Sequence, residues 1–345
     1  MRIDKNTTIR LGDRNIVKIK IGDSVIWQKD NIDYLYIENT YAGENTISVK
    51  QTITGSPDSS LYAKTLQYSK DKTNWTTITL SSTAYTITLN QGERVYLRGN
   101  EGVLNYYAND GAIQAVTNIL GTQTHTIGGN INTLVNYITP NNLTLPQGVF
   151  ARLFRNNTTI TSAENLTLPA TEMTPNCYIA LFYGCTSLVN APALPATILA
   201  NNCYVDTFHG CSKLVNAPKL PATEMKPNCY MSLFYGCTSL VNPPKLPATK
   251  MATECYRQLF KNCSSLVNAP ELPAKTLAEG CYQQLFYGCS KLNNVTIYAN
   301  DISATNCTLK WLSNVASTGT FRNLGTATYP TGESGIPTGW TIVKN

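Results

Sequence analysis

The spacing of the cysteines constrains the second half of this 345-residue chain more than any other feature. One set recurs every 26 residues from Cys177 to Cys307, and a second set, offset by eight residues, recurs from Cys185 to Cys289. Self-similarity at such a period is the signature of a repeat architecture. Because one short unit cannot bury its own apolar face, we expect the copies to stack in register as successive coils of a solenoid.

Each repeat follows one consensus, and five complete copies cover residues 168–295. The unit reads Leu-Pro-Ala-Thr, a Met or Leu, Cys-Tyr-x-x-Leu-Phe-x-Gly-Cys, and then Leu-Val-Asn-Ala-Pro. In each copy, apolar residues at four-residue spacing predict a short helix with one apolar face. In the first copy these residues are Met173, Cys177, Leu181 and Cys185.

A glycine slot follows the predicted helix in every copy but one. Asn262 replaces glycine there, and Asn is the residue that tolerates the left-handed conformation next best. The slot therefore predicts a positive φ and not merely a small side chain. The glycines are Gly184, Gly210, Gly236 and Gly288.

The cysteines could be zinc ligands, disulfides or small buried hydrophobes. A Cys-x7-Cys spacing is not typical of zinc sites, and two cysteines eight residues apart on a helix lie too far from each other to form a disulfide. We therefore expect reduced thiols that fill the interior. The sequence predicts no metal site and no cofactor.

The consensus resembles the leucine-rich repeats of the Bacteroides surface-antigen (BspA-like) type over about 150–345. The segment Gly335-Ile336-Pro337-Thr338-Gly339-Trp340-Thr341 is similar to the closing segment of such proteins. The resemblance implies a solenoid of strand–helix units that serves adhesion and display, with no enzymatic activity. We expect the outer coils to act as caps, with Trp311, Phe321 and Trp340 sealing the last one.

The N-terminal half reads as β-structure. Residues 9–28 contain two Gly-Asp turns between alternating apolar residues, which predicts hairpins. This segment resembles Gly-Asp-punctuated N-terminal segments of virion proteins from gut Bacteroidetes phages, including crAss-like ones. Strand-like runs and short turns over 32–115 predict a small sandwich, and Tyr68 to Trp75 resembles a hairpin of fibronectin-III-like or Ig-like modules. We expect Trp75 to lie in its core.

The expected fold class is thus multidomain α+β, with an all-β N-terminal half followed by a strand–helix leucine-rich-repeat solenoid. The predicted domains are a β anchoring segment (1–30), a β-sandwich (31–118), a linker and N-terminal cap (119–167), five repeats (168–295) and a C-terminal cap (296–345).

Composition limits the function classes. Charged residues make up 14%, and the net charge of +6 comes from scattered Lys and Arg without a basic run, so we expect no nucleic-acid partner. Apolar runs are too short for a bilayer, which argues against membrane insertion. The first eight residues lack the apolar core of a secretory signal, so we expect the protein either to stay where it is made, in the host cytoplasm, or to leave by another route, such as cell lysis.

No catalytic constellation is evident. His209 occupies a slot that is otherwise filled by Tyr or Lys, and His125 lies in the predicted linker; neither has a nucleophile or carboxylate partner recognisable from the sequence. Recognition is expected to use positions that vary within the fixed scaffold, although neutral drift of a solvated surface is the competing explanation. The candidate positions are Tyr183, His209, Tyr235, Lys261, Tyr287, Arg257, Gln258, Gln283 and Gln284.

These features predict a non-enzymatic phage virion surface protein, a fibre or decoration protein of head or tail. Residues 1–30 would contact other virion proteins, the solenoid would bind a host-surface protein or glycan, and a homo-oligomer is expected. Two alternatives are a bacterial cell-surface adhesin and a tail-associated polysaccharide-degrading enzyme, which would need paired acids in a cleft.

Overall fold

The structure is a computed structural model with two compact units, Met1–Asp33 and Tyr34–Asn345, which are described separately. The residues that it describes are 10–11, 14–15, 18–21, 24–28, 32–53, 64–99, 106–107, 113–137, 140 and 144–344.

The first unit contains two short antiparallel pairs. Strand β1 (Arg10–Leu11) pairs with β2 (Arg14–Asn15), and β3 (Lys18–Ile21) pairs with β4 (Ser24–Gln28). This confirms the predicted hairpin pairing. The two Gly-Asp dipeptides, and most of the predicted anchoring segment outside these strands, fall outside the described residues.

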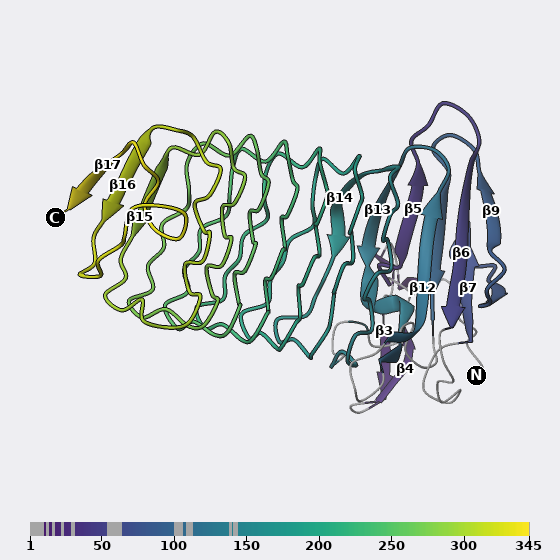
Figure 1. Cartoon of the computed structure of the whole chain (residues 1–345). Helices are drawn as coiled ribbons and strands as arrows, with labels where there is room; N and C mark the ends of the chain where they lie inside the picture. Colours follow the sequence, from purple (N-terminus) through teal and green to yellow (C-terminus); the bar gives the residue numbers. More distant parts are fainter. Residues whose placement is uncertain are drawn as a thin grey trace. The chain divides into compact units, whose positions relative to one another are not determined.

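The second unit begins with a mixed six-stranded sheet and an antiparallel four-stranded sheet whose buried side chains share one core. One sheet has the order β14-β13-β5-β10-β7-β8 and the other β11-β12-β6-β9 (Figure 1). The alternation of buried and exposed residues in β5 and β10 matches the expected strand period of two. The strands are β5 (Leu35–Asn39), β6 (Asn45–Ile53), β7 (Thr65–Ser69), β8 (Thr76–Thr79), β9 (Tyr85–Leu89), β10 (Arg94–Arg98), β11 (Tyr106–Tyr107), β12 (Ile113–Gly121), β13 (His125–Asn130) and β14 (Ile160–Thr167).

The predicted all-β N-terminal half is confirmed, but two details differ. In an immunoglobulin sandwich the last strand joins the sheet of strands C and F. By order along the chain, β7 and β10 correspond to strands C and F, and both lie in the six-stranded sheet. The last strand of the sandwich, β12, lies instead in the four-stranded sheet, beside β6. Trp75 is not in the core, because it lies half-buried on the outer face of the β10 sheet with the Arg98 guanidinium 3.8 Å from its ring centroid. One of the short turns predicted within 32–115, the Gly-Ser-Pro-Asp sequence at 55–58, falls outside the described residues.

The sandwich is continuous with the first coil of the repeats. Strand β13 pairs antiparallel with β5 on one side and parallel with β14 on the other. From the second sheet, the N–H of Ile119 donates to the carbonyl of Leu153 at 2.8 Å. The domain boundary expected between 118 and 119 therefore falls inside β12, and both sheets of the sandwich end on the first coil.

His125 lies at this junction and is fully buried, with 0% exposure. Its Nδ1 lies 2.9 Å from the Gln123 carbonyl, and its Nε2 lies 3.2 Å from Nδ2 of Asn157. The carbonyl requires a proton on Nδ1, so Nε2 accepts from the amide and the ring is neutral. Burial lowers the pKa of His125, which favours the same neutral form.

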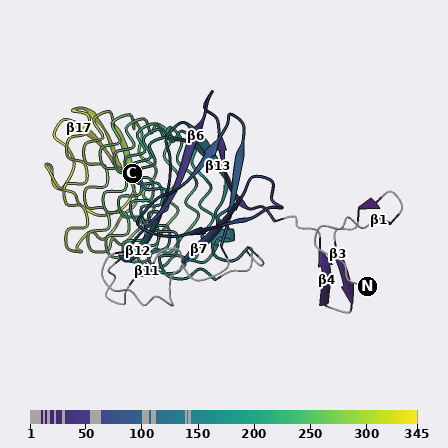
Figure 2. The same cartoon turned by 90° about the vertical axis from the view of Figure 1, so that its right-hand side faces the viewer.

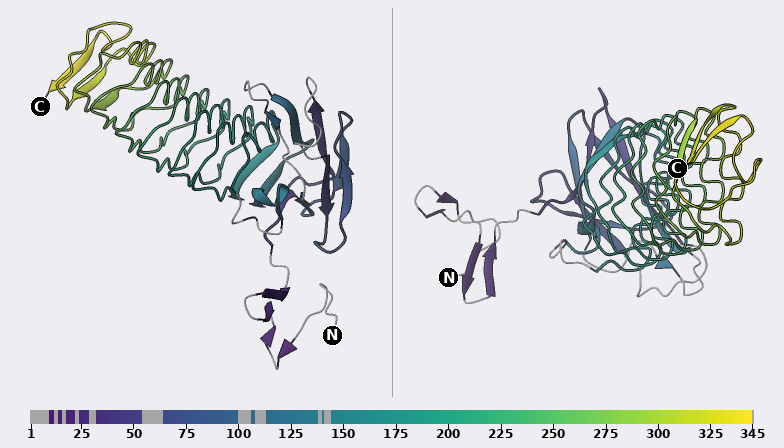
Figure 3. Two further views of the ribbon diagram at one scale, coloured as in Figure 1. Left: turned by 90° about the horizontal axis from the view of Figure 1, so that it is seen from below. Right: turned by 90° about the vertical axis from the view of Figure 1, so that its left-hand side faces the viewer.

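The repeats stack as coils along one axis in a single register (Figures 1 and 2). Equivalent aromatic side chains of neighbouring coils lie face to face in the interior. The tyrosine rings Tyr178 and Tyr204 have centroids 5.7 Å apart, and the phenylalanine rings Phe208 and Phe234 have centroids 5.8 Å apart. The left view of Figure 3, seen from below, shows the same coils lying next to one another, from teal near the sandwich to yellow at the C-terminal end, where β17 (Trp340–Lys344) lies.

The helix predicted in each repeat is wrong. Within the described residues, the helical element is a single 3-10 turn, η1 (Ile131–Leu134). The Cys-Tyr-x-x-Leu-Phe-x-Gly-Cys segment instead forms consecutive turns, which we call the turn ribbon and which spans 174–186 and its equivalents. Alternate N–H groups bond within the ribbon: that of Leu233 donates to the carbonyl of Tyr230 at 3.2 Å. The others bond to the next coil: that of Phe234 donates to the carbonyl of Leu259 at 3.0 Å.

The turn ribbon explains why a positive φ recurs every fourth residue. In one coil Asn228 has φ 57°, Ser232 has φ 55° and Gly236 has φ 70°. The prediction that the glycine slot needs a positive φ is confirmed, and Asn262 adopts φ 61° there. Its structural cause is the ribbon and not a helix cap.

All eleven cysteines lie within 144–344 and are buried, unpaired thiols, which confirms the predicted role as interior fillers. They also make a contact that was not predicted. The Cys237 Sγ donates to the carbonyl of Phe208 in the preceding coil at 3.2 Å, and Cys263 donates to that of Phe234 at 3.1 Å. Thiols thus connect neighbouring coils as well as filling space.

The last coil ends in a parallel sheet of β15 (Asn294–Ile297), β16 (Gly319–Asn323) and β17. Trp311 continues the tyrosine column, with its ring centroid 6.5 Å from that of Tyr282. The predicted sealing residues Trp311, Phe321 and Trp340 are all buried.

Candidate recognition face

The turn ribbon presents one face of the solenoid in fixed columns. Its four-residue pattern consists of a positive-φ residue, two interior residues and one outward residue. In the coil of Ser232, Leu233 and Phe234 point inward and Tyr235 lies half-buried on the surface. The interior residues are nearly invariant between copies, whereas the surface columns vary, so this face combines a uniform scaffold with a changing chemistry.

The column of Tyr183 forms a continuous ladder of aromatic and cationic groups. The His209 ring lies between the rings of Tyr183 and Tyr235, with centroid distances of 4.5 and 4.3 Å. The Lys261 ammonium lies 5.2 Å from the centroid of Tyr235 and 5.1 Å from that of Tyr287. The five predicted positions of this slot are therefore brought together.

The neighbouring column supplies a polar network at the C-terminal end of the face. Ser232 Oγ donates to Gln258 Oε1 at 3.2 Å, and Gln258 Nε2 donates to Gln284 Oε1 at 2.7 Å. The Lys261 ammonium also donates to Gln284 Oε1, at 2.9 Å. One nitrogen of the Arg257 guanidinium lies 3.0 Å from each carboxylate oxygen of Glu254. These contacts hold amide and cationic groups in place across three coils.

The chemistry of the face changes along the stack. The outward column that carries Arg257 and the half-buried Gln283 begins with Ile179, Val205 and Met231, of which Ile179 and Met231 are half-buried and Val205 is buried. The first and third coils therefore present an apolar side chain beside the ladder, and the next two present charge and amides. A ligand lying along the ladder would meet both.

One residue of the face, and one contact within it, were missed from the sequence. Arg155 extends the ladder by one coil, with its guanidinium 4.8 Å from the centroid of Tyr183. It follows a Leu-Phe pair just as Tyr183 does, but the repeat length is two residues longer there, so the period alone did not align it. Asp206 gives His209 the carboxylate partner that we did not predict, at 3.0 Å from Nδ1.

Burial shifts the pKa values of Lys261 on this face and of the thiols and phenols in the interior behind it. Partial burial, and then the neighbouring Arg257 cation, lower the pKa of Lys261. In the interior, burial raises the pKa of the Cys229 thiol to about 12 and that of Tyr204 well above its ordinary value. The interior thiols and phenols are therefore protonated at neutral pH and unsuited to nucleophilic attack.

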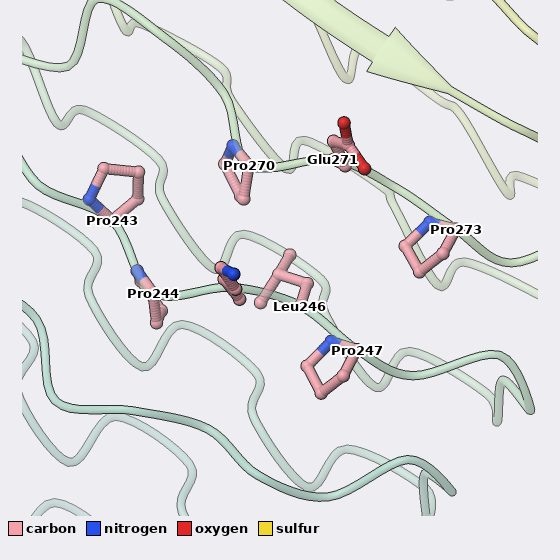
Figure 4. A pocket seen from close by; sticks show the side chains of 8 residues that line it. Pro243, Pro244, Leu246, Pro247, Pro270, Glu271 and Pro273 are labelled. Atoms are coloured by element: carbon pink, nitrogen blue, oxygen red, sulfur yellow. The ribbon is translucent and has the colours of Figure 1, made fainter.

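A second surface feature is a proline-rich groove on another side of the coils, with a volume of about 560 Å³. It lies between two neighbouring coils, one of which carries Pro243 where most copies have Ala (Figure 4). Its charged residues are Lys245 and Glu271. The remaining lining residues are Pro243, Pro244, Leu246, Pro247, Pro270 and Pro273.

Two features are absent from the described parts of the chain, with the gaps given above. No cluster of three or more His, Cys, Asp or Glu side chains there could hold a metal ion. No helix there is long and apolar enough to span a bilayer.

Comparison of the chain with protein-family models, with curated proteins and with solved structures found no match.

Proposed function

We propose that this chain is a structural protein of a phage particle surface, a head or tail fibre or decoration protein, which displays a repeat module for attachment to a host-surface protein or glycan. The observation that supports attachment is the contrast within the turn ribbon. The interior columns keep Cys, Tyr, Leu and Phe, while the outward columns change from coil to coil. Such a rigid support with variable outward positions suits recognition.

The proposed class is a leucine-rich repeat of the BspA-like type in which a turn ribbon takes the place of the helix. The consensus described above supports this assignment. The proposed Ig-like or fibronectin-III-like character of the sandwich, with the altered strand order, belongs to the same proposal. The sandwich would then serve as the N-terminal cap of the solenoid.

The ladder favours a polar ligand. Both faces of the His209 ring are covered by Tyr183 and Tyr235, and Lys261 and His209 lie against Tyr235. Since the ring faces are occupied, a ligand can reach only ring edges and polar ends. Hydroxyl groups of a glycan, or polar groups of a protein surface, fit this arrangement better than an apolar ligand that needs exposed ring faces.

The proposed location of the chain is the surface of the virion. Residues 1–30 contact other virion proteins, the chain acts as a homo-oligomer on the virion surface, and it neither catalyses a reaction nor binds nucleic acid nor inserts into a membrane. The resemblance of residues 9–28 to phage virion segments supports this setting. Purified particles should contain the protein by mass spectrometry, and its detection only in host cytoplasm would contradict the proposal.

Attachment can be tested with a matched pair of substitutions in the full chain. Lys261→Ala removes a cation from the ladder, and Lys250→Ala removes an exposed lysine that pairs with Glu224 on another side of the coils. Binding of the labelled protein to host cells should fall at least about fivefold for Lys261→Ala, as for an interface residue worth more than about 1 kcal/mol, and stay unchanged for Lys250→Ala. Equal effects would contradict recognition by this face.

The alternatives make different predictions. A bacterial cell-surface adhesin would be found in the envelope of uninfected cells, and a polysaccharide-degrading tail enzyme would release sugars from host capsule. The first is tested by fractionating uninfected cells and the second by incubating the protein with capsule.

A further inference from the structure

The outer face of the β10 sheet contains a polar groove that is separate from the turn ribbon. Its volume is about 280 Å³, close to the lower limit of small-molecule sites. The groove crosses β7, β8 and β10 and reaches the segment that follows η1. Its lining residues are Thr65, Leu66, Gln67, Thr77, Arg98, Gly99 and Tyr137.

The Arg98 guanidinium is held in this groove from three sides. It lies 3.8 Å from the ring centroid of Trp75 and 4.3 Å from that of Tyr137. Its Nε donates to Gln67 Oε1 at 2.9 Å, and Gln67 in turn donates to Thr77 Oγ1 at 3.5 Å. The side chain is therefore fixed before any ligand arrives, which reduces the entropy lost on binding.

Gly99 explains how the groove is formed. A Cβ at this position would collide with the carbonyl of Leu134 in η1, and the N–H of Gly99 donates to the carbonyl of Thr133 at 2.9 Å. Only glycine lets the η1 turn approach β10 so closely. This approach brings Tyr137 against Arg98.

The two Nη groups of Arg98 are the unused donors of the site. Among the described residues, the guanidinium makes its one hydrogen bond through Nε, and no carboxylate pairs with it. Arg94, on the same strand and face, provides the contrast. Its guanidinium lies over the Tyr36 ring at 4.4 Å, but it is paired with Glu38 at 2.7 Å.

From this geometry we infer that the Arg98 groove binds the carboxylate of an acidic sugar unit, such as a uronic acid residue of a polysaccharide. The planar guanidinium presents its two Nη groups as a fork that matches a carboxylate. Thr65 and Thr77 line the groove, and their hydroxyls can bond sugar hydroxyls, whereas an apolar peptide side chain offers them no partner. This site would be a second contact point, independent of the ladder on the solenoid.

Two-dimensional NMR of the full-length protein tests the site, because the indole N–H of Trp75 gives a signal of its own. That N–H donates to the carbonyl of Lys72 at 3.1 Å, next to the groove. The probes are a glucuronic acid hexasaccharide, a neutral glucose hexasaccharide, and inorganic phosphate, each up to about 10 mM, which nearly saturates a site with a Kd of about 1 mM. The acidic oligosaccharide should shift the Trp75 signal with saturation, and the other two should not.

Three variants make the result specific. Arg98→Lys keeps the charge over Trp75 but loses the fork, and it should weaken binding of the acidic oligosaccharide at least about tenfold. Gln67→Met frees Nε and should weaken it less, while Arg94→Lys should leave it unchanged. No saturable shift, equal binding of phosphate or of the neutral sugar, or equal effects of the two arginine substitutions would overturn the inference.

Discussion

The imidazole of His209 stacks on the phenol of Tyr235 in the next coil, with ring centroids 4.3 Å apart and ring planes 12° apart. The two residues are 26 positions apart and occupy the same slot of their repeats. This contact exists only because neighbouring coils repeat the same backbone conformation. It therefore links the surface chemistry to the single register of the stack.

The surface ladder should contribute little to stability compared with the interior beside it. His209→Ala removes one ring from the ladder and should lower the free energy of unfolding by about 1 kcal/mol or less. Phe208→Ala, one residue earlier but fully buried, should lower it by about 3–5 kcal/mol. Denaturant unfolding of both variants checks this. Similar losses would show that the ladder is part of the core.

The glycine slot should accept asparagine only where the following coil has glycine. Gly210 and Gly236 have nearly equal φ values of 72° and 70°, but the next coil carries Gly236 in the first case and Asn262 in the second. The side chain of Asn262 lies where a Cβ on Gly288 would be. An asparagine in this slot therefore occupies the space that the side chain of the equivalent residue in the following coil would need.

We therefore expect Gly210→Asn to cost about 1 kcal/mol or less, because Asn tolerates this conformation. Gly236→Asn should cost about 1–3 kcal/mol more, because its amide would meet the Cβ of Asn262. Thermal unfolding of the two variants, side by side, measures the difference. Equal losses would rule out the steric explanation.

Removing a buried tyrosine hydroxyl should stabilise the stack. The hydroxyl of Tyr204 is buried and has no hydrogen-bond partner among the described protein groups, and Tyr178, Tyr230 and Tyr256 share this property. Burying an unpaired polar group costs about 1–3 kcal/mol, so Tyr204→Phe should raise the free energy of unfolding by about that amount. A loss of stability in denaturant unfolding would show that the hydroxyl has a partner.

Acid should weaken the junction between sandwich and solenoid. The pKa of His125 is lowered by burial, so the unfolded chain, with the ordinary value of 6.5, binds more protons at mildly acidic pH. The free energy of unfolding should fall as pH drops below about 6.5, by at most about 1.4 kcal/mol per pH unit from this group.

His125→Gln is the variant that isolates this effect. Glutamine is uncharged over the whole range, and the groups that contact the ring, Gln123, Asn157 and Thr159, are uncharged too. Unfolding curves from pH 7 to pH 5 should show a smaller slope for the variant than for the unmodified protein. The same slope in both would assign the acid sensitivity to other groups.

Features of the solenoid that recur in every repeat could be predicted from the sequence, because the 26-residue period shows which positions are equivalent. The stacking, the buried cysteines and the positive φ of Gly184 and Asn262 all follow from the 26-residue spacing. The helix was wrongly predicted because the turn ribbon also places apolar residues four apart. Positive φ values at Asn176 and Ala180 distinguish the two. Asn176 is compatible with that conformation, but alanine at position 180 gives no sign of it in the sequence.

The junction and the Arg98 groove could not be predicted, because both depend on pairing between distant segments. Strand β13 joins β5, about 90 residues earlier, and β14, about 35 residues later, so His125 looked isolated in the sequence. In the same way, Arg98 meets Trp75 and Tyr137 only after β10 and η1 are in place. Spacing within one segment contains no information about such contacts.

Sulfur anomalous scattering from a crystal of the full-length protein measures the stacking register most directly. The stacked coils predict two rows of cysteine sulfur peaks, six in one row from Cys177 to Cys307 and five in the other from Cys185 to Cys289. No two of these peaks should lie near the S–S bond length of about 2.05 Å, and no metal peak should lie between them. Bonded sulfur pairs, a bound metal, or sulfurs scattered out of the two rows would contradict a solenoid with a uniform, dry interior.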